Sequence, residues 1–158
     1  MSDHYIIIAD QGHLRIFLWR EPAGQRTPTL EEIQHLDFPG SSGKYTARDT
    51  DMAGRFQSSK HPAAGSGSPT ARTGMSIDER LPMQREEERR RVRNLALAID
   101  EFMRARPGAS WDFAAAAAIH HAVIEAVSSG VRSRLRRAVA KDLVHQPVGE
   151  LRAHFSGR

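Results

Sequence analysis

The sequence contains no cysteine, which excludes disulfide bonds, cysteine-based zinc sites and cysteine nucleophiles. It also lacks a long hydrophobic run, because the aliphatic stretch nearest the N-terminus covers only Ile6–Ala9. That length is far too short for the core of a signal peptide or for a membrane span. We therefore expect a cytoplasmic protein without a membrane-spanning segment.

Motifs that bind metals or phosphate groups are missing as well. None of the eight histidines forms an H-E-x-x-H pair, and the adjacent His120 and His121 should point to different faces. There is no phosphate-binding glycine motif and no G-x-S-x-G elbow. Neither a bound metal nor another cofactor is expected, and the sequence favours a protein that is not an enzyme.

The chain has 158 residues, of which 39% are hydrophobic and 27% charged, as in one soluble globular domain covering residues 1–158. The net charge of +4 is unevenly distributed. Residues 131–158 hold seven basic and two acidic side chains, whereas the rest of the chain is nearly balanced. This basic end indicates either a contact with nucleic acid or simply a solvated face.

The N-terminal part predicts a meander of three antiparallel strands. Tyr5–Ala9 is apolar, Asp10-Gln11-Gly12 is a turn, and residues 14–19 alternate along a second strand. Residues 30–38 are expected to form a third strand. From about residue 39 to residue 78 Gly, Ser, Pro, Thr and Ala dominate, which predicts a long flexible loop that could contact a protein partner.

A long amphipathic helix should follow, from Pro82 in its first turn to a break at Arg106-Pro107-Gly108. Its Glu86–Arg90 and Glu87–Arg91 pairs have the favourable i,i+4 spacing.

The run "FAAAAAI" poses the main structural question, because alanine favours a helix but no residue of the run is polar. We expect a strand buried on both faces from Trp111 to Ile119, followed by a helix from His120 to Gly130. A short helical piece to about Arg137, a last strand over residues 138–143 and a helix over residues 147–155 complete the chain. The predicted fold is therefore α/β (α+β): a mixed five-stranded sheet, in which the meander is followed by two crossover units, with helices packed on the sheet.

Polar residues after two of the predicted strands give a candidate site. The ends of parallel strands lie at one edge of a sheet, where ligands of such folds bind. The residues expected there are His120, His121, Lys141, Asp142 and His145. The alternative is that Asp142 and His145 only satisfy backbone groups ahead of Pro147.

Four stretches of this chain resemble the bacterial family of proteins required for attachment to host cells. They are "IIIADQGHLRIF", "ARDTDMAGRFQSS", "EEERRRVRNLALAIDEF" and "VRSRLRRAVAKDLVHQPVGELRAHF". In the last stretch Val144 stands where the family's Lys-Asp-Leu-Thr-His-x-Pro run has threonine. His120 and His121 stand where members usually have a proline-rich turn.

The family is in turn similar to the middle domain of archaeal and eukaryotic peptide-chain release factors. The loop that carries Gly-Gly-Gln in those factors corresponds to residues 39–78, which contain no such tripeptide. The resemblance therefore implies a non-catalytic module that docks to the ribosome or RNA without hydrolysis. The residues expected to contact RNA are Arg55, Arg72, Arg132, Arg134, Arg136 and Arg137.

Two other functions remain open. The family label implies a protein that acts in adhesion to host cells, at or near the cell surface. A weaker possibility is a hydrolase that uses Lys141, Asp142 and His145. The oligomeric state is unknown from the sequence.

Overall fold

The fold is taken from a computed structural model, which describes residues 3–21, 24, 27–38 and 77–156, with the side chains of α2 described from Leu81 onward. The expected flexible loop over residues 39–78 lies outside the described residues except at its last two positions, Ile77 and Asp78, which begin α2.

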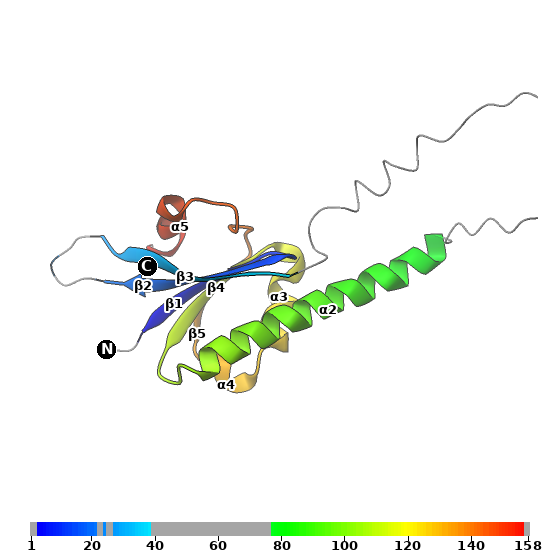
Figure 1. The fold of residues 1–158 in the computed structure, drawn as a ribbon, viewed down its shortest axis with the longest axis horizontal. Coiled ribbons are helices and arrows are strands. Elements are labelled where there is room, and N and C mark those ends of the chain that lie inside the picture. Colours follow the sequence, from blue (N-terminus) through cyan, green and yellow to red (C-terminus); the bar gives the residue numbers. More distant parts are fainter. Residues whose placement is uncertain (1–2, 22–23, 25–26, 39–76, 157–158) are drawn as a thin grey trace, which may run out of the picture.

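Five strands form one mixed sheet in the order β3-β2-β1-β4-β5 (Figure 1). Strands β1 (His4–Ala9), β2 (His13–Arg20) and β3 (Thr29–Asp37) are antiparallel neighbours. Strands β4 (Ser110–Ala115) and β5 (Leu135–Val139) continue the sheet from β1 in parallel. This arrangement confirms the predicted fold class, with its meander and two crossover units.

Helix α2 (Ile77–Arg104) makes the first crossover and packs on one face of the sheet. Leu95, Ile99 and Met103 are buried there against the sheet, as their helical spacing predicts. The helix begins five residues before Pro82, which therefore lies in its second turn. Figure 1 shows that the N-terminal part of α2 extends beyond the sheet. Both predicted ion pairs are present, with N···O distances of 3.5 Å for Glu86–Arg90 and 3.6 Å for Glu87–Arg91.

The alanine run divides between a strand and a helix. Strand β4 ends at Ala115 and α3 (Ala117–Ala126) begins two residues later, so the prediction of a strand as far as Ile119 is wrong for residues 116–119. The reason is that β1, the central partner of β4, ends where Ala9 pairs with Ala115. Beyond that pair the high helix propensity of alanine prevails, and Ala117 and Ala118 are exposed.

The segment after α3 also differs from the prediction of one helix to Gly130. The chain becomes extended at Val127, and a separate short helix α4 (Ser129–Arg132) follows. Strand β5 begins three residues later, where the sequence predicted helix to Arg137 and strand over residues 138–143. These boundaries were wrong because β5 pairs with β4 only from Leu135 to Val139. Leu143 lies beyond the strand and is buried on the face of the sheet that α2 does not cover.

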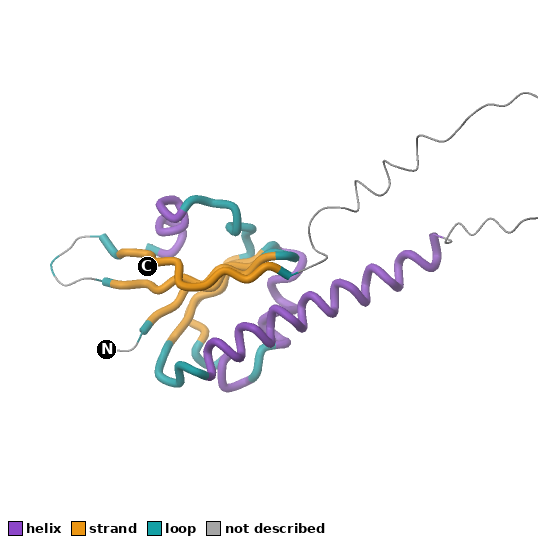
Figure 2. Tube along the Cα trace, in the orientation of Figure 1, coloured by secondary structure: helices purple, strands orange, loops and turns teal. Residues whose placement is uncertain are grey.

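The second face of the sheet is covered by α5 (Val148–Phe155) and the loop before it. Leu151 and Phe155 of α5 pack with Leu143 and Val144 against Ile6 and Ile8 of β1. Figure 2 shows α5 on the side of the sheet away from α2 and α3. The structure is therefore layered as helices, sheet and helix, and the loop that leads to α5 crosses the edge where the parallel strands end.

Candidate functional site

The three parallel strands end at a common edge of the sheet. Ala9 pairs with Ala115, and Ala114 pairs with Val139. The residues that follow these strands are therefore neighbours although they are far apart in the sequence. Asp10 follows β1, α3 follows β4, and the segment 140–147 follows β5.

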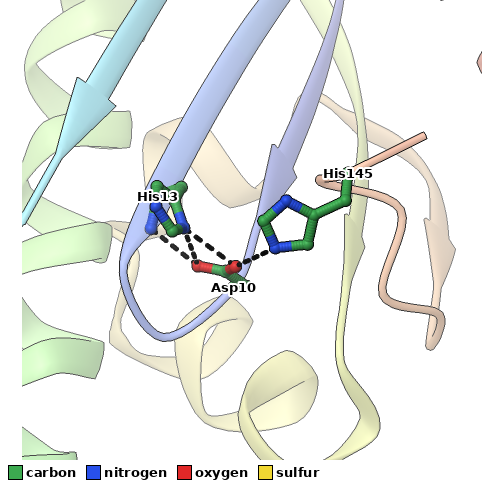
Figure 3. Close-up of side chains that lie close together, drawn as sticks. All are labelled: Asp10, His13 and His145. Atoms are coloured by element: carbon green, nitrogen blue, oxygen red, sulfur yellow. Dashed lines mark hydrogen bonds and ion pairs between the residues drawn. The ribbon is translucent and has the colours of Figure 1, made fainter. Parts of the chain in front are cut away.

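Asp10 lies at the centre of a cluster of polar side chains at this edge. Figure 3 shows its carboxylate between the imidazole rings of His13 and His145. Both carboxylate oxygens lie 3.0 Å from Nδ1 of His13, and Oδ2 lies 3.5 Å from Nε2 of His145. We call Asp10, His13 and His145 the edge cluster.

The β1–β2 turn fixes the carboxylate of Asp10. The backbone N–H groups of Gly12 and His13 donate to its Oδ1 over 2.6 and 2.7 Å, which is the Asx-turn arrangement. Burial alone would raise the pKa of this carboxyl group. The hydrogen bonds from Gly12 and His13, together with the His13 charge, outweigh burial and hold the pKa below its usual value.

Arg15 holds the loop that carries His145. Its Nη1 donates to the carbonyl oxygens of Val144, at 2.5 Å, and Gln146, at 3.2 Å. Two hydrogen bonds to Glu32, of 3.0 and 2.7 Å, orient the guanidinium in turn. Because the residues on either side of His145 are bound to β2, the backbone beneath this exposed side chain is fixed.

A second group of ionisable side chains adjoins the edge cluster. Nε2 of His13 lies 3.8 Å from a carboxylate oxygen of Asp37, and the same oxygen lies 3.1 Å from Nε2 of His35. The cluster therefore continues onto the end of β3, with alternating imidazole and carboxylate groups.

The five residues of the predicted polar site lie in three different parts of the structure. His145 joins the edge cluster. Asp142 accepts a hydrogen bond from the backbone N–H of Val144 at 3.3 Å, which is the structural role considered as the alternative, and Lys141 is exposed beside it.

His120 and His121 lie within α3 rather than after a strand. The ring of His120 stacks on Phe113, and burial lowers the pKa of its imidazole, as does the neighbouring His121. His121 is exposed, with Nε2 at 3.1 Å from Glu125 one turn along the helix.

The predicted RNA-contacting arginines also divide. Arg134 and Arg137 are partly buried and donate to backbone carbonyl oxygens, whereas Arg132 and Arg136 are exposed. Arg55 and Arg72 lie outside the described residues.

Sequence reasoning missed His13 and did not connect Asp10 with His145. The signal that could have found them is the Asp-x-x-His spacing across a tight hairpin, which brings the second side chain back toward the first.

These features define a layered mixed α/β protein with a histidine–carboxylate cluster at the edge where its parallel strands end. A family model described as "Protein required for attachment to host cells" matches residues 5–155, and the chain therefore belongs to this family. The family name connects the protein with host attachment. No curated protein matches the chain. Within the described residues, no helix combines the length and apolar character needed to cross a membrane.

Proposed function

We propose that this member of the family is a non-catalytic binding module that contacts RNA, in particular on the ribosome, from within the cytoplasm. The proposal includes a relationship of its fold to the middle domain of peptide-chain release factors. The single observation that carries it is the exposure of Arg132 and Arg136 in the most basic part of the chain.

These two arginines are available to a partner. Arg132 is in the last turn of α4, and Arg136 lies on β5, the edge strand of the sheet. Among the described residues neither guanidinium has an ion-pair partner or hydrogen-bond acceptor. An exposed guanidinium presents a planar set of donors that matches a phosphate group.

Sedimentation with ribosomes and filter binding to ribosomal RNA, each over a series of salt concentrations, test the proposal. The informative variant is Arg132→Ala/Arg136→Ala. The matched control is Arg20→Ala/Arg93→Ala, which removes the same charge from exposed positions on β2 and α2. Each phosphate contact that is lost should reduce the slope of log affinity against log salt by about 0.7 to 1.

We expect the wild type to bind at low salt, the first variant to bind more weakly with a slope reduced by about 1 to 2, and the control to retain the wild-type slope. A protein that stays in the supernatant at low salt contradicts the proposal. Equal losses for the variant and the control contradict the assignment of the contact to α4 and β5.

The family name favours a second candidate, a protein that acts in adhesion at or near the cell surface. Fractionation of native cells distinguishes the two. A pool confined to the cytoplasm excludes direct contact with a host and leaves an indirect, intracellular role in attachment, whereas a surface pool supports the adhesion function.

A further inference from the structure

We propose that Asp10, His13 and His145 bind a divalent first-row transition metal ion of the Zn²⁺ class. The site does not depend on the RNA contact proposed above. Spacing along the sequence gave no reason to expect it, because His145 is more than 130 positions from Asp10 and only the fold brings them together.

The distances between the donor atoms fit a shared metal ion. One ligand atom from each of the three residues can be chosen so that all lie within 4.8 Å of one another. With metal–ligand bonds of about 2.1 Å, neighbouring ligand atoms in a tetrahedral site are about 3.4 Å apart. The Asp10–His13 and Asp10–His145 separations are 3.0 and 3.5 Å, so small side-chain rotations complete the geometry.

The ligands are held in place before any ion arrives. Gly12 and His13 fix Oδ1 of Asp10 through their backbone N–H groups, which leaves Oδ2 facing both imidazole rings. Arg15 fixes the backbone on both sides of His145. Pre-ordered ligands lower the entropic cost of binding an ion.

The carboxylate of Asp37 lies near the second ring nitrogen of His13. If Nδ1 of His13 binds the metal, its Nε2 lies 3.8 Å from a carboxylate oxygen of Asp37. Metal-binding histidines generally donate their second N–H to such a group, which fixes the ring and raises its basicity. At 3.8 Å the two atoms are too far apart for a hydrogen bond, and the same oxygen lies 3.1 Å from Nε2 of His35, so Asp37 would have to move toward His13 to act as an outer carboxylate.

The donor set selects the kind of metal. Two imidazoles and one carboxylate suit Zn²⁺, Co²⁺, Ni²⁺ or Fe²⁺, whereas Mg²⁺ and Ca²⁺ prefer oxygen ligands throughout. The His145 side chain is 74% exposed, so the remaining coordination positions face solvent. Water or a small anionic ligand would occupy them.

The test uses the full-length, untagged chain, because a histidine tag would itself bind metal. After treatment with a chelator, Zn²⁺ binding is measured by titration calorimetry, and coordination by the visible absorption of the Co²⁺ form. The ligand variants are His13→Ala and His145→Ala. The control is His121→Ala, which removes an exposed histidine outside the edge cluster.

We expect the wild type and the control to bind one equivalent of Zn²⁺ with the same affinity, and each ligand variant to lose at least about a hundredfold. Asp37→Asn should lose about tenfold, the usual effect of an outer-shell change. His145→Ala should fold normally because its side chain is exposed, and circular dichroism checks this.

The competing explanation is that the three side chains contact one another through hydrogen bonds alone and bind no metal. In that case the wild type shows no stoichiometric Zn²⁺ binding, or the ligand variants bind as the wild type does. Either result overturns the proposal. A visible Co²⁺ spectrum that disappears in both ligand variants supports it.

Discussion

At the scale of single residues, Arg134 makes several hydrogen bonds to backbone carbonyl groups. Its guanidinium donates to the carbonyl oxygens of Arg106, Met103 and Ala109 over 2.6, 2.9 and 3.1 Å. These carbonyls belong to the last turn of α2 and the loop that follows it, where helix geometry leaves acceptors without partners. A residue that was expected to contact RNA therefore joins the end of α2 to the start of β5.

We predict that Arg134→Ala lowers the free energy of unfolding by about 3 kcal/mol, because several partly buried carbonyl groups lose a charged donor together. Arg134→Lys should recover only part of the loss, since an ammonium group cannot reach all of the acceptors in the same plane. Urea denaturation measures both. Arg136→Ala, at an exposed position, should change stability by no more than about 0.5 kcal/mol, and a similar loss in that variant would contradict the structural role of Arg134.

Among the elements, α2 does more than cross over the sheet. Asp100, a buried residue on α2, accepts hydrogen bonds from the backbone N–H of Ser128 at 3.1 Å and from its hydroxyl group at 2.9 Å. Ser128 directly precedes α4 as its N-cap residue. The carboxylate of a residue on α2 therefore accepts hydrogen bonds from the residue at the start of α4. This contact joins the extended segment between α3 and α4 to α2.

We predict that Asp100→Ala lowers the free energy of unfolding by about 2 to 3 kcal/mol, because the partly buried donors of Ser128 lose a charged acceptor. Ser128→Ala should cost about 1 kcal/mol, since the backbone N–H keeps its partner. If the two residues act through this one contact, the double variant costs less than the sum of the single variants. Strict additivity in a double-mutant cycle would show that Asp100 acts elsewhere.

In the whole molecule, Arg15 connects parts that are distant in the sequence. It links β2 to the loop before α5, and Glu32 on β3 orients it. The same loop places His145 beside Asp10 and buries Leu143 and Val144 against the sheet. The arrangement of the edge cluster therefore depends on an ion pair between two neighbouring strands.

We predict that Arg15→Ala increases the hydrogen-exchange rates of the backbone amides in residues 143–146 more than elsewhere.

The Arg15 guanidinium, through hydrogen bonding and charge, holds the pKa of Glu32 below its usual value although burial opposes it. A carboxyl group with a lowered folded-state pKa stabilises the protein above its unfolded-state pKa of 4.5, and this contribution disappears as the pH falls further. Glu32→Gln should therefore remove part of the acid sensitivity of unfolding between about pH 5 and pH 3.

A control for this prediction is Arg20→Ala. Arg20 and Glu31 form an ion pair at 3.9 Å in which both side chains are 64% exposed. Pairs of this kind contribute little, so exchange and acid unfolding should match those of the wild type. Acid unfolding of Glu32→Gln that is indistinguishable from wild type would mean that the Arg15–Glu32 pair does not contribute to stability.

The sequence by itself determined the order and type of most elements. The apolar run of β1, the alternation along β2 and the helical spacing along α2 are local patterns, which can be recognised without knowledge of the tertiary structure. The mixed sheet follows from that order. His145 was predicted to follow a strand over residues 138–143, whereas β5 ends at Val139 and His145 lies on the loop after it.

Only the tertiary structure decided where the alanine run stops being a strand, because alanine fits either state and the end of β1 sets the limit. It also decided which arginines are structural, since Arg134 and Arg136 are indistinguishable in a basic segment until the carbonyl groups around them are known. The edge cluster is the clearest case. No local rule relates His13 to His145, and they meet because parallel pairing brings the ends of β1, β4 and β5 to one edge while Arg15 holds the last loop against β2.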